Sequence, residues 1–343
     1  MNINYLLNKL IERKDLNKKE AMILMEEIFQ GRLTPAQIAA FLTALRMKGE
    51  TVDEILGFIT VMREHMVKIK TKGLIIDTCG TGGDGSGTFN ISTASAFVVA
   101  GAGVKVAKHG NRAASSLCGS ADVLEELGVN INLTPKQAEE MLEKTCFTFL
   151  FAPLYHPAMK FVGSVRKELG IRTVFNFLGP FVSPAQVKRQ IIGVPNIKLA
   201  EKLANIAVNL HYEHLMLVSS EDGLDEISLC ARTYVVEVIG KKIKKTVIDP
   251  GEFGFKKVLP NAYKGGDAET NAQIIRKIFE GKDGPHKEIV ILNSAAAFLV
   301  AGKVKELKKG IELAKNSIEN GDAQKVLENT IEYSKYINKH AAA

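Results

Sequence analysis

An alternation of short β-rich runs with helical stretches begins near Leu74 and constrains the fold more than any other feature of the chain. The apolar runs, each typical of a buried strand, occupy residues 74–76, 104–107, 129–131, 147–150, 191–194, 215–218 and 289–292. Helical stretches near 92–101, 121–127 and 135–144 lie among the first four runs. Repeated strand, helix, strand units predict a mostly parallel sheet covered on both faces, and residues 232–248 are typical of a hairpin at its edge.

The first seventy or so residues have a different pattern, in which apolar residues recur at helical spacing. Three helix starts are marked by capping-box pairs, which are Asn17 with Glu20, Thr34 with Gln37, and Thr51 with Glu54. These signals predict a unit of four helices. Because the apolar stripes are narrow, we expect this unit to pack on the rest of the chain or on a second subunit, and dimerisation through it is a hypothesis.

These patterns together predict an α/β fold class, with a small all-helical N-terminal domain and a larger α/β domain built on a mostly parallel central sheet. We expect the helical domain at residues 1–72, completed by a segment near 165–185, and the α/β domain at 73–343. A chain of 343 residues, 46% of them hydrophobic, is long enough to bury a full core.

Composition excludes several classes of protein. The four cysteines are far apart in sequence and lack the spacing of zinc sites or disulfide scaffolds. The N-terminus has no signal-peptide pattern, and no apolar run approaches the roughly 20 residues of a membrane span, so we expect a cytoplasmic protein with no membrane partner. A net charge of +7 is compatible with a nucleic-acid partner, an anionic substrate or a solvated lysine-rich surface, and charge alone does not decide among them.

A glycine-rich segment from Gly80 to Asp84 follows the first predicted strand and leads to a helix that starts near Ser92. Consecutive glycines allow backbone N–H groups to converge on an anion, and the N-terminus of the next helix also favours phosphate. A dinucleotide site would need an acidic residue about 20 positions further on, and residues 101–108 contain none. A P-loop would need a closing Gly-Lys-Ser/Thr, which is missing. We therefore predict a cradle for a pyrophosphate-like anion.

Two further polar clusters follow predicted strands, at the same carboxyl-terminal rim of the sheet. Residues 108–116 hold cations, amides and hydroxyls, of which Lys108 and a serine pair are suited to pyrophosphate. Asp225 and Glu226, which follow the run at 215–218, are suited to a Mg²⁺ ion whose other ligands are substrate phosphates and water. Three clusters at one rim indicate a site for a Mg²⁺-bound polyphosphate.

At these residues the chain resembles anthranilate phosphoribosyltransferase, an enzyme of tryptophan biosynthesis, and the resemblance covers nearly the whole sequence. Eight ordered segments carry it, which are residues 80–84, 90–93, 108–112, 156–159, 166–170, 172–176, 178–180 and 223–226. The resemblance implies a Mg²⁺-dependent reaction in which phosphoribosyl pyrophosphate (PRPP) donates its phosphoribosyl group to anthranilate. It also implies a homodimer joined through the helical domain.

The same resemblance implies a set of site residues. Those expected to surround the donor are Gly80, Gly83, Asp84, Thr88, Asn90, Ile91, Ser92, Thr93, Lys108, His109, Gly110, Asn111, Arg112, Ala113, Ala114, Ser115, Ser116 and Ser120. Those expected at anthranilate are Gly80, His109, Asn111, Arg166 and Pro180. Two Mg²⁺ ions per subunit are expected, bound by Ser92, Asp225 and Glu226. No protein nucleophile is expected, and Lys108 with Asp84 would stabilise the transition state.

These residue types suit the implied chemistry. Arg166 supplies a planar guanidinium for the acceptor carboxylate, and displacement of pyrophosphate by the amine predicts inversion at ribose C1. A pyrimidine-nucleoside phosphorylase is the rival enzyme, but its phosphate loop and Ser/Arg signature differ from the residues here. A nucleic-acid binder is the rival from another class, and binding a phosphate backbone would not require Asp84, Asp225 and Glu226.

Overall fold

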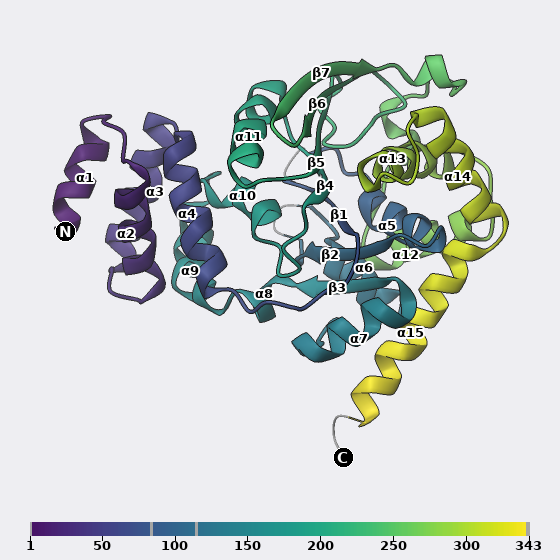
Figure 1. Ribbon diagram of the computed structural model, residues 1–343, viewed down its shortest axis with the longest axis horizontal. Helices are drawn as coiled ribbons and strands as arrows, with labels where there is room; N and C mark the ends of the chain where they lie inside the picture. Colours follow the sequence, from purple (N-terminus) through teal and green to yellow (C-terminus); the bar gives the residue numbers. More distant parts are fainter. Residues whose placement is uncertain (1, 83–84, 114–115, 341–343) are drawn as a thin grey trace. The chain divides into compact units, whose positions relative to one another are not determined.

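The computed structural model describes residues 2–82, 85–113 and 116–340 of the chain (Figure 1). The chain divides into two compact units, each formed from two segments. The first unit comprises Met1–Lys68 and Pro153–Pro184, and the second comprises Ile69–Ala152 and Ala185–Ala343. Within the described residues, no helix combines the length and apolar character that crossing a membrane requires.

The first unit is helical, as predicted. Its long N-terminal helices are α1 (Ile3–Ile11), α2 (Lys18–Phe29), α3 (Pro35–Lys48) and α4 (Val52–His65). The second segment adds the 3-10 turns Pro157–Met159 and Gly179–Val182, helix α9 (Lys160–Leu169) and the short helix α10 (Phe175–Leu178), and α8 (Ala152–Tyr155) precedes them. The three predicted capping boxes are formed at the starts of α2, α3 and α4, which confirms the predicted helix starts.

The second unit contains a seven-stranded sheet in the order β3-β2-β1-β4-β5-β6-β7. The strands are β1 (Ile75–Gly80), β2 (Lys105–Gly110), β3 (Phe147–Phe151), β4 (Arg189–Gly193), β5 (His214–Ser220), β6 (Thr233–Ile239) and β7 (Lys242–Ile248). The first five strands pair in parallel, whereas β6 and β7 are antiparallel and form an edge hairpin. The structure thus confirms the mostly parallel sheet and the predicted hairpin.

Helices of the second unit bury the sheet. They are α5 (Ile91–Gly101), α6 (Ser120–Glu126), α7 (Pro135–Thr145), α11 (Ile197–Asn209), α12 (Ala268–Phe279), α13 (Pro285–Ala301), α14 (Leu307–Glu319) and α15 (Asp322–His340), with 3-10 turns at Pro250–Phe253 and Pro260–Tyr263. Leu215 and Leu217 point to one face of the sheet, Met216 and Val218 to the other, and all four are buried. Side chains on both faces of β5 are therefore covered, as a mostly parallel sheet requires.

Two predicted strands are wrong. Residues 289–292 lie inside α13, a helix buried on nearly all sides that begins at Pro285 and is capped by Gly302 in the left-handed region. Both a buried strand and a buried helix can have a continuous run of apolar residues, and the length of the run is what distinguishes the helix from the strand. Residues 129–131 form no strand, because the Asn130 N–H donates instead to Ser334 Oγ of α15, at 3.0 Å.

Candidate active site

The glycine-rich loop leaves the carboxyl end of β1 beside β4. Gly80 pairs in parallel register with Gly193 of β4, and the Thr81 N–H donates to the Gly193 carbonyl at 2.8 Å. Gly82 then takes a φ of +70°, which a residue without a β-carbon adopts at little cost. Gly83 and Asp84, both expected at the donor, lie outside the described residues.

Asp225 contacts this loop, although it lies far along the sequence. The Gly82 N–H donates to Asp225 Oδ2 at 3.0 Å. A β-carbon built on Gly80 would lie 2.5 Å from the same oxygen, so the Asp225 carboxylate packs directly on the Gly80 backbone. The structure therefore brings together the first and third predicted clusters. Glu226 follows in the same turn and, like Asp225, is half-buried.

Gly193 is a site residue that the sequence analysis missed. A β-carbon at this position would lie 1.5 Å from the Asp225 carbonyl oxygen, closer than two non-bonded atoms approach. Residues 191–194 were interpreted only as a strand. The available signal was the glycine itself, because a glycine inside a strand often marks the close approach of another backbone.

Lys108, Ser92 and Thr78 form a second contact group at this rim. The Lys108 ammonium, only 2% exposed, donates to Ser92 Oγ at 3.2 Å and to the Thr78 carbonyl. Thr78 Oγ1 donates to the Ser92 carbonyl at 3.0 Å. Ser92 lies in the first turn of α5, where backbone N–H groups and the helix dipole favour an anion. The second predicted cluster thus meets the residues that follow the glycine loop.

Asp77 is a buried carboxylate beneath this group, and the sequence analysis assigned it nothing. Its Oδ2 accepts from Gln190 Nε2 at 3.0 Å and its Oδ1 from the His109 N–H at 3.4 Å. Burial raises the pKa of Asp77 to about 6, an effect that the nearby Lys108 charge and these hydrogen bonds oppose. Tyr212 donates to Gln190 Oε1 at 3.1 Å and extends the buried network.

The other residues expected at the donor occupy several settings. Asn90 occupies the position just before α5 without a capping hydrogen bond from its side chain, and its Nδ2 donates to the Cys118 carbonyl at 3.2 Å. Ile91 and Thr93 are each 1% exposed, so their side chains belong to the core. Thr88 forms an isolated antiparallel bridge with Lys264.

Residues 111–113, which follow β2, contact α6. Arg112 donates to Glu125 Oε1 at 3.1 Å and to Asp122 Oδ1 at 3.0 Å, so acidic side chains of α6 already pair with its guanidinium. The Ala113 N–H also donates to Asp122, and Ser120 Oγ donates to the Asn111 carbonyl at 3.3 Å. A β-carbon on Gly110 would meet the Ser120 hydroxyl. Ser116 is exposed, and Ala114 and Ser115 lie outside the described residues.

Arg166 and Pro180, expected at anthranilate, belong to the helical unit. Arg166 is a half-buried residue of α9 whose guanidinium lies 5.4 Å from the centre of the Phe175 ring. Burial lowers its pKa below the usual range, and none of the residues that the structure describes forms an ion pair with it. Pro180 is buried in a 3-10 turn. A half-buried cation without a counter-charge is suited to an anionic ligand.

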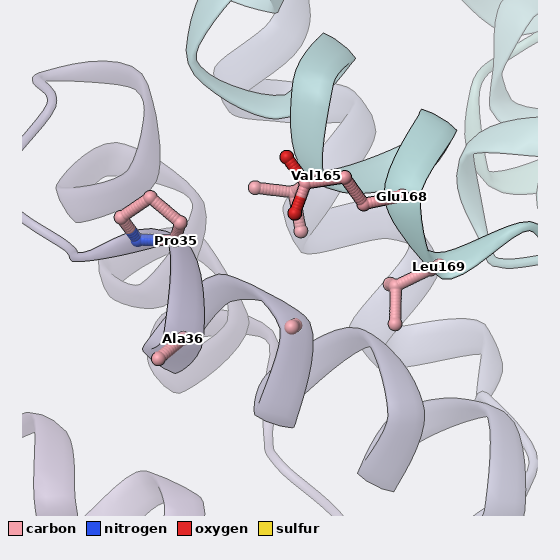
Figure 2. A pocket seen from close by; sticks show the side chains of 6 residues that line it. Pro35, Ala36, Val165, Glu168 and Leu169 are labelled. Atoms are coloured by element: carbon pink, nitrogen blue, oxygen red, sulfur yellow. The ribbon is translucent and has the colours of Figure 1, made fainter.

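The helical unit also contains a groove of about 340 Å³ between α3 and α9 (Figure 2). The side chains that line it are Pro35, Ala36, Ala39, Val165, Glu168 and Leu169. None of these is a predicted site residue. The groove is therefore distinct from the polar clusters at the rim of the sheet.

Comparison with known proteins accounts for both parts of the chain. Residues 72–324 match the glycosyl transferase family a/b domain, and residues 4–66 match the helical bundle domain of that family. An anthranilate phosphoribosyltransferase of Dehalococcoides mccartyi is 48% identical over 330 residues, covering 96% of this chain and 97% of the relative. Another, from Acetivibrio thermocellus, is 48% identical and covers 96% and 95% of the two chains.

Solved structures agree with these relatives. Anthranilate phosphoribosyltransferase from Thermus thermophilus is similar with a TM-score of 0.90 at 39% identity, over 96% of this chain and 99% of that one. The Saccharomyces cerevisiae enzyme in complex with PRPP and Mg has a TM-score of 0.89 at 28% identity, over 97% and 98% of the chains. The resemblance inferred from sequence is thus confirmed, and the chain belongs to the anthranilate phosphoribosyltransferase family.

Proposed function

We propose that this enzyme transfers the phosphoribosyl group of PRPP to the amine of anthranilate, giving N-(5-phosphoribosyl)anthranilate and pyrophosphate. One observation carries the proposal, namely the contact of the glycine loop with Asp225 through the Gly82 N–H at 3.0 Å. It joins an anion-binding loop to a carboxylate at the carboxyl ends of parallel strands, where open α/β sheets bind ligands. The relatives with this name, aligned over almost the whole chain, support the choice of substrates.

Mg²⁺ is the cofactor that these oxygen donors fit, with two ions proposed per subunit. Ser92, Asp225 and Glu226 offer a hydroxyl and two carboxylates, which are ligands that Mg²⁺ accepts. Among residues 2–82, 85–113 and 116–340, no group of three or more His, Cys, Asp or Glu side chains could hold a metal ion. That finding suits an ion that arrives with the donor, because Mg²⁺ usually keeps substrate phosphates and waters among its ligands. When bound, Mg²⁺ supplies positive charge to the leaving pyrophosphate.

The chain itself contributes binding and electrostatic stabilisation, without a protein nucleophile. We propose that Lys108, held at Ser92 Oγ, and Asp84 stabilise the transition state as the bond from ribose C1 to pyrophosphate breaks. The amine of anthranilate attacks from the opposite face, so the configuration at C1 inverts. Orientation of the two substrates accounts for up to about 7–11 kcal/mol of the barrier in favourable cases.

Donor binding is proposed for the loop and helix-start residues named from the sequence. Two contact groups at the rim of the sheet support it, which are Gly80 and Gly82 with Asp225, and Ser92 with Lys108. Arg112 contributes least through its side chain, since Glu125 and Asp122 pair with its guanidinium. For anthranilate, we propose that Arg166 binds the carboxylate, since its guanidinium has no counter-charge among the described residues.

We also propose that the enzyme is a homodimer and that the exposed face of α3, in the helical unit, forms the interface. Ile11 of α1 and Met47 of α3 are 63% and 70% exposed and line one shallow pocket, and exposed apolar side chains that gather in one patch mark interaction sites. Between them the outer side of α3 carries the small residues Ala40, Thr43 and Ala44, which allow a second helix to approach closely. We further propose that the enzyme acts in the cytoplasm, in the second step of tryptophan synthesis from chorismate.

Phosphorus NMR tests the proposed reaction directly. Incubation with PRPP, anthranilate and MgCl₂ should release pyrophosphate in equal amount to a new phosphoribosyl product. In proton NMR of that product, the coupling of the C1 proton to the C2 proton should report the inverted configuration. Omission of anthranilate should stop release. Pyrophosphate release that does not depend on anthranilate would contradict the proposal, because it would identify a hydrolase.

A further inference from the structure

The segment that carries Asp225 and Glu226 has no regular secondary structure, so side-chain contacts must fix it. Between β5 and β6 the chain turns at Asp222 to Leu224, where the Gly223 N–H donates to the Ser220 carbonyl at 3.0 Å. Ser228 Oγ donates to Asp222 Oδ2 at 2.6 Å and closes the segment on itself. These contacts hold the start of the segment, and further along the Ser228 N–H donates to Thr233 Oγ1 at 3.1 Å. The backbone of Ile227 lies between these anchored positions.

Asn293 of α13 holds that backbone. Its Oδ1 accepts from the Ile227 N–H at 2.9 Å, and its Nδ2 donates to the Ile227 carbonyl at 2.9 Å. The same Nδ2 donates to the Ile289 carbonyl one turn earlier in α13, also at 2.9 Å. Asn293 is 5% exposed, so all three hydrogen bonds are made in a buried environment. One amide thus pairs with both backbone groups of a single residue, as a neighbouring strand would.

Helix propensity does not explain an asparagine at this position. Asparagine is an unfavourable residue in a helix interior, and α13 is otherwise built from apolar and small side chains around residue 293. An apolar residue would leave the buried Ile227 N–H and carbonyl without these partners, which is costly. The amide therefore serves Ile227, which lies one residue after Glu226 and two after Asp225.

We infer that Asn293 is a positioning residue that sets the Asp225 and Glu226 carboxylates for the Mg²⁺-bound donor. Adjacent α-carbons are a fixed ~3.8 Å apart, so a shift of Ile227 must move Glu226. On the other side, Gly82 and Gly193 fix Asp225 through its carboxylate and its carbonyl. Asn293 supplies a further attachment, at Ile227, from a helix that the donor site is not expected to include. This inference rests on the proposed function.

The test compares the wild-type enzyme with Asn293→Ala and Asn293→Gln, since a longer side chain cannot place its amide at both Ile227 groups. Ser294→Ala is the matched control, because Ser294 is the next residue of α13, is fully buried, and has no hydrogen-bond partner for its hydroxyl among the described residues. The readouts are the Mg²⁺ concentration for half-maximal turnover, the KM for anthranilate, and Mn²⁺ binding with pyrophosphate measured by electron paramagnetic resonance.

Both Asn293 variants should raise the half-saturating Mg²⁺ concentration and weaken Mn²⁺ binding by about tenfold or more, the usual effect of removing a residue that orients metal ligands. Their anthranilate KM and the behaviour of Ser294→Ala should stay at wild-type values. If Asn293→Ala does not fold, Asn293→Gln carries the test, and loss of folding in both variants overturns the inference.

Failure of the inference and failure of the proposed function give different results. Wild-type enzyme without Mg²⁺-dependent turnover would overturn both. Normal wild-type behaviour together with wild-type Mg²⁺ and Mn²⁺ responses in the Asn293 variants would overturn the inference alone. So would an equal change in the Mg²⁺ response and the anthranilate KM, because that pattern indicates a general loss of structure.

Discussion

Replacing Gly193 with alanine perturbs the donor site from a position inside the sheet. The added β-carbon would lie 1.5 Å from the Asp225 carbonyl oxygen and 2.5 Å from its carbonyl carbon. Ordinary contact begins near 3.4 Å, so the Asp225 backbone must move by about 1.9 Å. The hydrogen bond from the Gly82 N–H to Asp225 Oδ2, now 3.0 Å, does not survive a shift of that size.

The expected loss follows from this displacement. A misplacement of about 1 Å in a catalytic arrangement costs about 100-fold, and the shift here is larger. We therefore predict that kcat/KM for PRPP falls by at least about 100-fold, equivalent to about 2.7 kcal/mol of transition-state stabilisation. Overpacking also costs about 1–3 kcal/mol of folding free energy, a loss that a well-buried sheet should tolerate.

Steady-state kinetics with varied PRPP at saturating anthranilate and Mg²⁺ measure the effect, and thermal unfolding checks the fold. Gly163→Ala in α9 is the control, because a β-carbon there meets nothing within 4 Å. It should retain wild-type kinetics. A Gly193→Ala enzyme with kcat/KM for PRPP close to the wild-type value would refute the account of how Asp225 is placed.

Three further changes test the remaining assignments. Arg166→Ala should raise the anthranilate KM by about 10- to 100-fold, as expected for a lost charged hydrogen bond of about 1.5–3 kcal/mol. The KM for PRPP should stay nearly unchanged. If steady-state kinetics show the reverse pattern, Arg166 binds the donor and not anthranilate. Burial raises the pKa of Asp77 to about 6, so its carboxylate ionises as pH rises and then attracts and holds the Lys108 ammonium at the donor site. Turnover should therefore increase through pH about 6, and Asp77→Asn should flatten that limb of the pH profile. An unchanged limb would show that Asp77 does not cause it. Met47→Glu should shift the proposed dimer toward monomer in light scattering. Leu259→Glu should not, because Leu259 is an exposed residue of the other unit. A dimer that survives Met47→Glu would exclude this face of α3 as the dimer interface.

Local sequence signals predicted much of the fold. The capping boxes at Asn17, Thr34 and Thr51 form as expected, because each depends only on residues three positions apart. Residues 289–292 were assigned to a strand because a run of apolar residues does not distinguish a buried strand from a buried helix. The apolar and small residues continue as far as Gly302, and this length would have indicated a helix.

The rim of the sheet was predictable because parallel strands end at the same edge. That rule brings together Lys108 and Ser92, and the turn that holds Asp225 with the glycine loop. The glycine at position 193 was a local signal of a close backbone contact, but its partner Asp225 and the contacts of Asn293 were not predictable, since they depend on strand register and on the packing of α13.

Anthranilate fluorescence measures the central claim most directly, because consumption of the amine can be followed continuously. With PRPP and MgCl₂ the signal should decay at a rate proportional to enzyme concentration, EDTA should stop the decay, and excess MgCl₂ should restore it. Fluorescence that stays constant with all components present would contradict the proposed reaction, and decay that persists in EDTA would contradict the Mg²⁺ assignment to Ser92, Asp225 and Glu226.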